Sequence, residues 1–260
     1  MIKLKIGFLD SGIGGLTVLS EALKKIPNHE YLYYADSVHA PYGEKPKEEV
    51  RQYVCDAVDF LIKQGAEIVV IACNTATSIA AAELRNKYSI PIIGMEPAVK
   101  PAIELSQKVN KRVLVTATPL TLKEEKMKKL LKQYDKYGVV DLCPLSKLVN
   151  FAENFDFSDE TVLPYLEREL SPFNLENYGS IVLGCTHFPL FSEQIRTFFS
   201  SDVAIVTGNL GTVNYLGEMI AERSTITPKK NVTFYYSGSM VIEEKEIESF
   251  NYILRQLNAM

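Results

Sequence analysis

The strongest constraint on the fold is a regular alternation of short apolar runs with longer amphipathic segments. The short runs are rich in β-branched residues and predict strands at residues 4–9, 30–35, 68–72, 91–94, 112–116, 139–142, 180–184 and 232–236. Between them, apolar residues recur with helical spacing at residues 16–26, 47–64, 75–88 and 120–137. Strands that alternate with helices indicate an α/β fold, in which mostly parallel sheets are flanked by helices.

A weak internal repeat divides this pattern into two halves. Ile-Val-Val-Ile-Ala-Cys73 in the first half and Ser-Ile-Val-Leu-Gly-Cys185 in the second are apolar strands that end in a cysteine, followed by small polar residues. Prolines at positions 97 and 101 indicate one boundary near residues 96–101, and a second boundary is expected near residues 207–208. We therefore predict two pseudo-symmetric lobes, residues 1–96 plus 208–260 and residues 97–207, with the active site in the cleft between them.

Composition and charge exclude several classes of protein. With 28 basic and 32 acidic residues and a formal net charge of -4, the chain lacks the dense positive charge that binds nucleic acid. The longest apolar run, residues 68–73, is far shorter than the roughly 20 residues that cross a bilayer, and the N-terminal stretch lacks the apolar core of a signal peptide. We expect a cytoplasmic protein without nucleic-acid or membrane partners.

The cysteines and histidines are too few and too scattered for a disulfide framework or a zinc site. There are four cysteines and three histidines, and no two cysteines have Cys-x-x-Cys spacing, so we expect no metal. Cys73 and Cys185 each follow a strand instead, at the sheet edge where α/β proteins bind ligands. A helix is expected to begin after each cysteine, and its N-terminal N–H groups should lower the thiol pKa.

Two matched thiols suit a reaction that needs a base on one face of a carbon and an acid on the other. In stereoinversion, one thiolate removes a proton and the opposite thiol returns one. Disulfide exchange is the competing use, but it usually employs neighbouring cysteines. One buried cysteine alone would be interpreted as a small apolar residue, whereas two in matching motifs favour chemistry. Candidate acid–base partners are His187, two residues after Cys185, and Asp10, which could alternatively cap the following helix.

A glycine-rich turn follows the first strand and partly imitates a dinucleotide-binding fingerprint. It reads Asp10-Ser11-Gly12-Ile13-Gly14-Gly15, and Asp36 lies roughly 20 residues beyond it. The third glycine is misplaced, however, and Asp10 would set a negative charge beside a pyrophosphate, so we expect no nucleotide cofactor. A turn rich in free N–H groups can equally hold a carboxylate.

Five short motifs occur in series over nearly the whole chain. They are Asp10-Ser11-Gly-x-Gly-Gly, Pro41-Tyr42-Gly43, Cys73-Asn74-Thr75-Ala76, Gly94-x-Glu96-Pro97-Ala98 and Gly184-Cys185-Thr186-His187-x-Pro189-Leu190. Together they resemble the motif set of the cofactor-independent glutamate racemases, in the aspartate/glutamate racemase superfamily. The resemblance implies that two thiols invert the α-carbon of glutamate without pyridoxal phosphate or another cofactor, and so supply D-glutamate for bacterial peptidoglycan. It further implies that Cys73 takes the proton from D-glutamate and that Cys185 takes it from L-glutamate.

The resemblance also implies roles for other residues. Asp10 would assist Cys73, His187 would assist Cys185, and Glu153 falls where the family has an acidic residue. The implied substrate-binding residues are Asp10, Ser11, Pro41, Tyr42, Gly43, Asn74, Thr75, Thr118, Thr121, Thr186 and His187. The partner would be a small molecule, glutamate. Because family members often dimerise, the resemblance is also compatible with a homodimer.

Three positions depart from the family pattern. His39 stands where an arginine commonly precedes Pro-Tyr-Gly, Ala117-Thr118 replaces Gly-Thr, and Val206-Thr207-Gly208 replaces Asp-Ser-Gly. The first two of these departures concern substrate affinity and lobe contacts more than the type of reaction. Two alternatives stay open. The first is a racemase for aspartate or another acidic amino acid on the same scaffold, because the length of the substrate side chain is not legible in the sequence. The second is a non-catalytic small-ligand-binding protein, against which the paired cysteines argue.

Overall fold

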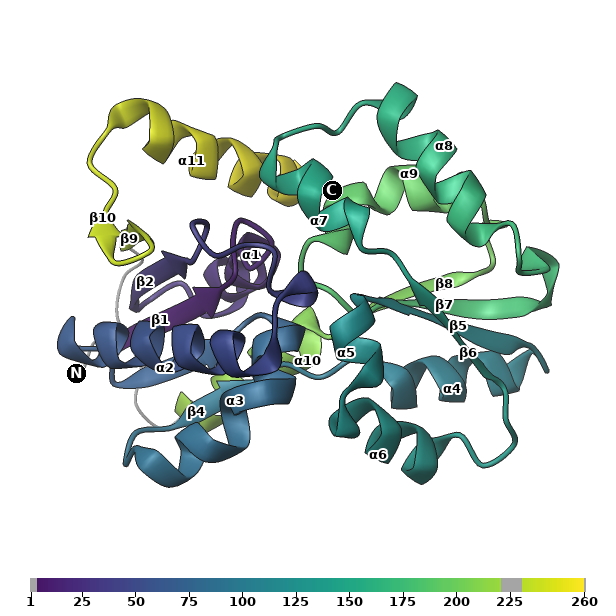
Figure 1. Ribbon diagram of the computed structural model, residues 1–260, viewed down its shortest axis with the longest axis horizontal. Coiled ribbons are helices and arrows are strands. Elements are labelled where there is room, and N and C mark those ends of the chain that lie inside the picture. Colours follow the sequence, from purple (N-terminus) through teal and green to yellow (C-terminus); the bar gives the residue numbers. More distant parts are fainter. Residues whose placement is uncertain (1–3, 221–230, 260) are drawn as a thin grey trace.

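Two separate β-sheets form the framework of the molecule, a computed structural model that describes residues 4–220 and 231–259 (Figure 1). The first sheet is six-stranded, in the order β10-β9-β2-β1-β3-β4. Its strands are β1 (Lys5–Asp10), β2 (Glu30–Ala35), β3 (Ile68–Ile71), β4 (Ile92–Gly94), β9 (Asn231–Tyr236) and β10 (Ser239–Met240). Neighbouring strands are parallel, except that β10 pairs with β9 in an antiparallel hairpin.

The second sheet is four-stranded and entirely parallel, in the order β6-β5-β7-β8. Its strands are β5 (Arg112–Ala117), β6 (Val140–Pro144), β7 (Tyr178–Leu183) and β8 (Ala204–Thr207). The interior strands β3 and β7 are buried along their whole length, which is why residues 68–71 and 181–183 form continuous apolar runs in the sequence. The predicted α/β fold with two mostly parallel sheets is confirmed.

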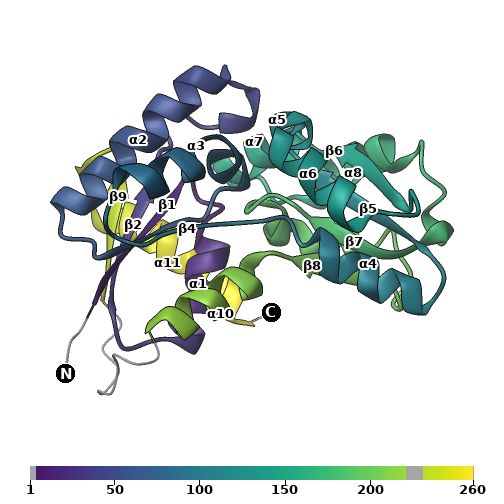
Figure 2. The ribbon, with the colours of Figure 1, turned by 90° about the horizontal axis from the view of Figure 1, so that it is seen from below.

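Helices cover both faces of the six-stranded sheet. On one face lie α2 (Lys47–Lys63) and α3 (Asn74–Lys87), and on the other lie α1 (Leu16–Lys25), α10 (Asn209–Ile220) and α11 (Glu244–Ala259) (Figure 2). These helices are amphipathic, and their apolar stripes pack on the sheet. In α2 the buried stripe includes Val50, Val54, Ala57, Val58 and Leu61, as the helical spacing predicts.

The four-stranded sheet is covered in the same way. Helices α4 (Val99–Lys108) and α6 (Glu125–Tyr134) pack on the face that carries Val113 and Val115. Helices α7 (Lys147–Glu153), α8 (Asp159–Leu170) and α9 (Ser192–Arg196) lie on the opposite face (Figure 1). The apolar pattern does not predict these last three helices, nor β8 and β10. Among the described residues, no helix is long and apolar enough to span a bilayer.

The single helix predicted over residues 120–137 is wrong, because the structure has two. Helix α5 (Pro119–Lys123) ends at Glu124, and α6 begins directly after it. Glu124 has an extended backbone, with φ -67° and ψ 148°. Its side chain accepts a hydrogen bond at 2.7 Å from Nζ of Lys47, at the start of α2. The break in the helix therefore places a carboxylate against the other lobe, a contact that helical periodicity cannot reveal.

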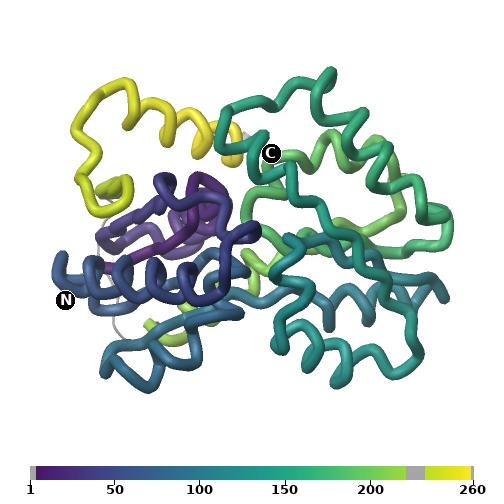
Figure 3. The backbone as a smooth tube through the Cα atoms, in the orientation of Figure 1, coloured from purple at the N-terminus to yellow at the C-terminus, as the bar shows by residue number. Residues whose placement is uncertain are grey.

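The chain passes from the first sheet to the second after β4 and returns after β8. Figure 3 shows that the C-terminal segment consequently lies with the N-terminal one. A Cβ built on Gly208 would lie 2.4 Å from the carbonyl oxygen of Glu96, so the two crossing segments touch. The carboxyl ends of β1 and β3 meet those of β5 and β7 beside this crossing. Exact lobe boundaries at 96 and 208 stay a prediction.

Candidate active site

Asp10, the last residue of β1, lies buried at the contact between the lobes. Its Oδ1 accepts a hydrogen bond from Gly12 N at 3.0 Å, and its Oδ2 accepts one from Thr186 Oγ1 of the second lobe at 2.9 Å. Burial raises the pKa of Asp10, although the charge of His187 and the two hydrogen bonds oppose that shift. The carboxyl group therefore binds a proton more readily than a free aspartate does.

The glycine-rich turn after β1 holds a carboxylate, but this carboxylate belongs to the protein. Ile13 N donates to Glu153 Oε1 at 2.8 Å, across the two lobes. A Cβ built on Gly12 would lie 1.9 Å from that same oxygen, and one built on Gly14 would lie 2.3 Å from Nδ1 of His187. The turn needs these glycines because ionisable side chains from the second lobe pack directly on its backbone.

Cys73 caps the N-terminus of α3, yet its thiol is not made more acidic. Ala76 N donates to its Sγ at 3.5 Å, and the thiol donates to Ser11 Oγ at 3.9 Å. Burial, together with the negative charge of Asp10, raises the pKa of Cys73 above its ordinary value. The expectation that the helix terminus lowers this pKa is wrong, because the side chain is only 5% exposed and desolvation outweighs the effect of the terminus.

Cys185 follows β7 and is paired with a buried imidazole. Its Sγ lies 3.7 Å from Nδ1 of His187, and Nε2 of the same ring lies 2.6 Å from Glu153 Oε1. Burial opposes the charged imidazole, but hydrogen bonds to Cys185 and Glu153 outweigh it, and the pKa of His187 is raised well above its ordinary value. A charged ring donates from both nitrogens, one toward each partner.

The two halves of the internal repeat differ in structure. After Cys73 the chain enters α3, whereas after Cys185 it enters the 3-10 turn Phe188–Phe191, which continues directly into α9. A helical segment thus follows each cysteine, as predicted, but the positive group near the Cys185 sulfur is the His187 side chain. Both cysteines nevertheless lie near Asp10, because Ser11 contacts the Cys73 thiol and Thr186, next to Cys185, donates to the Asp10 carboxylate.

Three threonines from the two lobes form a buried hydroxyl cluster. Thr75 Oγ1 lies 3.1 Å from Thr118 Oγ1 and 2.9 Å from Thr121 Oγ1. Gly43 packs against this cluster, since a Cβ built on it would lie 2.6 Å from Cβ of Thr118. Beside Thr75, the buried Asn74 has an Oδ1 without a hydrogen-bond partner. Such an acceptor costs roughly 1–3 kcal/mol unless a ligand supplies a donor.

Tyr42 adjoins the cluster, but its hydroxyl already has a partner. It donates to Asp36 Oδ2 at 2.5 Å, and Asp36 is itself 2% exposed. Sequence reasoning considers Asp36 only as part of a nucleotide motif and misses it as a neighbour of the site. The sequence does place Asp36 directly after a predicted strand, as it places Asp10 at the end of another. In the structure β1 and β2 are parallel neighbours, and the backbone N–H of Asp36 donates to the carbonyl of Asp10 at 3.0 Å.

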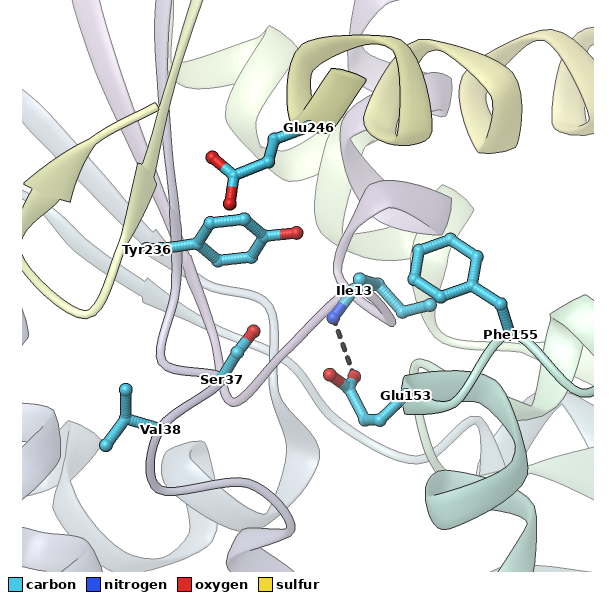
Figure 4. Close-up of a pocket in the computed structure, with 7 residues that line it drawn as sticks. All are labelled: Ile13, Ser37, Val38, Glu153, Phe155, Tyr236 and Glu246. Atoms are coloured by element: carbon cyan, nitrogen blue, oxygen red, sulfur yellow. Dashed lines mark hydrogen bonds between the residues drawn. The ribbon is translucent and has the colours of Figure 1, made fainter. Parts of the chain in front are cut away.

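A cavity of about 380 Å³ lies beside Glu153 and contains neither cysteine (Figure 4). It is lined by Ile13, Ser37, Val38, Glu153, Phe155, Tyr236 and Glu246. Two carboxylates border it, which disfavours a negatively charged substrate. The cavity therefore suits a negatively charged substrate poorly. Within residues 4–220 and 231–259, no three His, Cys, Asp or Glu side chains are grouped as a metal site requires.

Comparison with known proteins identifies relatives along the whole chain. Residues 16–216 match the family model described as Asp/Glu/hydantoin racemase. Glutamate racemase 2 of Bacillus subtilis (strain 168) is 47% identical over 256 residues, which cover 98% of this chain and 97% of the relative. A glutamate racemase of Halothermothrix orenii is 46% identical over 257 residues, covering 98% of this chain and 100% of the relative.

A solved structure has the same arrangement of the two lobes. The Escherichia coli glutamate racemase, determined in complex with L-glutamate and the activator UDP-MurNAc-Ala, aligns with a TM-score of 0.83 at 26% sequence identity. The alignment covers 98% of this chain and 96% of that one. The similarity therefore extends over both sheets and the contact between them.

Proposed function

This chain belongs to the glutamate racemases of the Asp/Glu/hydantoin racemase family, which makes it an isomerase, and we propose that Cys73 and Cys185 invert the α-carbon of glutamate. The observation that carries this proposal is a single buried site in which the ends of β3 and β7 bring two thiols together with Asp10 and His187. A substrate held there presents one face of its α-carbon to each sulfur.

From L- to D-glutamate, Cys185 is the base and Cys73 is the acid. The Cys185 sulfur, 3.7 Å from Nδ1 of His187, takes the α-proton as a thiolate, while the bonding electron pair is left on the α-carbon and its carboxylate. The Cys73 thiol then gives its proton to the opposite face and becomes a thiolate. The raised pKa of Cys73 supports this assignment, because it keeps the proton on that sulfur until transfer. In the reverse direction the two roles exchange.

Asp10 and Glu153 assist the sulfurs from a distance. Glu153 accepts from His187 Nε2 at 2.6 Å, and so favours the charged ring that faces Cys185. The negative charge of Asp10 raises the pKa of Cys73, which favours its protonated form. We assign Asp10 to Cys73 and Glu153, through His187, to Cys185.

The groups available to bind the substrate are neutral donors and acceptors. We assign the unpartnered Oδ1 of Asn74 to the substrate ammonium group, because that group supplies the donor the oxygen lacks. The substrate carboxylates would be held by backbone N–H groups near Gly43 and by nearby hydroxyls, which come from Ser11, Thr75, Thr118, Thr121 and Thr186.

Isotope exchange tests the proposed reaction. Incubating the protein in D2O with either enantiomer of glutamate should move the optical rotation toward zero and place deuterium at the α-carbon. Unchanged enantiomer without deuterium would contradict the proposal. Parallel reactions with L- and D-aspartate determine whether the shorter acid is also a substrate.

The expected product, D-glutamate, would serve the synthesis of bacterial peptidoglycan in the cytoplasm. The resemblance to the family is also compatible with a homodimer, and light scattering of the purified protein would test this.

Substituting each cysteine separately tests the two-base scheme. Cys73→Ser and Cys185→Ser should each lower racemisation by at least about 100-fold, because a hydroxyl is far less acidic than a thiol and cannot replace it. Cys55→Ser is the matched control, because Cys55 lies in α2, away from the site, and this variant should keep its activity. Full activity in either site variant would overturn the scheme.

A further inference from the structure

Asp36 is a buried carboxylate on which three separate segments converge. It directly follows β2 and is 2% exposed. Its Oδ2 accepts from the hydroxyl of Tyr42 at 2.5 Å, and its Oδ1 accepts from Ser237 Oγ at 2.8 Å. Nδ1 of His39 lies 2.9 Å from both oxygens. No direct contact joins this carboxylate to either cysteine, so any effect on the reaction has to pass through its partners.

The first partner, Tyr42, connects Asp36 to the segment Pro41–Gly43. The Tyr42 side chain is 1% exposed and packs in the core beneath α2 and α3. With its ring buried and its hydroxyl bound to Asp36, Tyr42 fixes the backbone of the residue that follows it. That residue is Gly43, which packs so closely on Thr118 of the second lobe that a Cβ would lie 2.6 Å from the Thr118 Cβ.

The other two partners hold the same loop from the outside. Ser237, in the turn between β9 and β10, donates to Asp36 and also accepts from Val38 N at 3.2 Å. His39 stacks on Tyr53 of α2, with ring centroids 3.8 Å apart and planes 13° apart. The segment 36–43 therefore contacts the β9–β10 turn through Asp36, helix α2 through His39, and the threonine hydroxyl cluster through Gly43.

We propose that Asp36 is a positioning residue for substrate binding: through Tyr42 it holds the segment Pro41–Gly43 against the Thr75, Thr118 and Thr121 hydroxyls. This inference rests on the proposed racemase function and assigns Asp36 no proton transfer. Nδ1 of His39 faces the same carboxylate, and the imidazole supplies a further donor to it. Loss of the network should therefore weaken substrate binding more than it slows the chemical step.

A double-mutant cycle tests whether Asp36 acts through Tyr42. Asp36→Asn and Tyr42→Phe should each raise KM for glutamate roughly tenfold and change kcat by less than about threefold. The combined effect on KM should be smaller than the sum of the two single effects, because Asp36→Asn weakens the charge-assisted hydrogen bond that Tyr42→Phe removes. Additive effects, or a loss confined to kcat with KM unchanged, would overturn the proposal.

Three further measurements separate positioning from simple stability and from failure of the proposed function. The thermal midpoint of each variant identifies any unfolding, and KM is compared only at temperatures at which every variant is folded.

The His39 variants test whether the donor matters. His39→Arg should retain the KM for glutamate within about twofold. His39→Phe keeps the stacked ring but has no donor, and it should raise this KM. Equal KM in these two variants would contradict a role for the donor. Absence of glutamate racemisation by the unmodified protein would contradict the proposed function itself. If the unmodified protein racemises glutamate and Asp36→Asn has the same KM, only the positioning role of Asp36 is contradicted.

Discussion

Two buried ionisable residues, Asp10 and His187, and the partly buried Glu153 form a set of coupled charges beside the two thiols. Asp10 and His187 influence one another's protonation, and Glu153 contacts both the imidazole and the turn that follows Asp10. In such a site each proton position depends on its neighbours, so removal of one charge changes the pKa of the next group. Two predictions at the residue scale follow, and in each the removal of a carboxylate lowers the pKa of its neighbour.

The first concerns His187. Because its pKa in the folded state is raised, the ring should stay protonated above about pH 6.5, where a free histidine loses its proton. The stabilisation from this charge is fully present below that pH and is lost as the pH rises through the folded-state pKa. Glu153→Gln should lower the His187 pKa. Imidazole NMR titration can measure this, because the chain has only three histidines. An unchanged His187 titration would show that Glu153 does not hold the charge.

The second concerns Cys73. Asp10→Asn should lower the pKa of the Cys73 thiol, because it removes a negative charge that raises it. Alkylation of Cys73 by iodoacetamide at pH 8 should therefore become faster, while racemisation becomes slower. Mass spectrometry of the labelled peptides gives both the rate and the site, and Cys55 provides an internal reference. Slower labelling of Cys73 would contradict the coupling between these residues.

At the scale of elements, the turn after β1 shows why a glycine-rich segment need not bind a nucleotide. In this turn the backbone N–H of Ile13 donates to Glu153 of α7. Gly12 and Gly14 leave space for the side chains of Glu153 and His187, which pack on the turn. Helix α3 shows a related point, since its N-terminus contacts a thiol too deeply buried to be made acidic. In both elements the sequence predicts where the motif lies in the fold. Which group binds the turn, and whether the thiol pKa is lowered or raised, depends on residues from elsewhere in the chain.

Substitution of Gly14 in this turn should therefore displace the imidazole of His187. Gly14→Ala would place a methyl group 2.3 Å from Nδ1 of His187, so the ring has to move, and racemisation should fall by at least about 100-fold. Gly211→Ala is the matched control, because nothing lies within 4 Å of the added methyl group and helix α10 gains roughly 0.5–1 kcal/mol of stability. Activity in Gly14→Ala equal to that of the control would contradict this packing.

At the scale of the whole molecule, the site consists of contacts between two lobes that each have a sheet and helices on both faces. Asp10 with Thr186, Ile13 with Glu153, and Thr75 with Thr118 all join the first lobe to the second. The salt bridge between Lys47 and Glu124 adds a further connection on the α2 side. A substrate bound among these residues contacts both lobes at once, and it should stabilise their mutual arrangement.

Ligand binding should accordingly be visible in thermal unfolding. At a D-glutamate concentration about 100 times its Kd, binding should add about 2.7 kcal/mol and raise Tm by about 5–10 °C for a chain of this size. Differential scanning calorimetry measures the shift, and glycine, which lacks the side-chain carboxylate, should produce none at the same concentration. Hydrogen exchange should slow in both β1 and β7. Protection confined to one lobe would show that the substrate does not bridge them.

Periodicity and short motifs depend on neighbouring residues, so the sequence alone predicts eight of the strands, the helices over residues 16–26, 47–64 and 75–88, the two cysteine motifs and the family resemblance. The broken helix at Glu124, the charge state of Cys73 and the role of Asp36 were not legible. They depend on desolvation and on contacts between residues far apart in the chain, such as Asp36 with Ser237 and Ile13 with Glu153. Local periodicity places a thiol at the end of a strand, but its pKa depends on the charges and the burial that the folded chain brings around it.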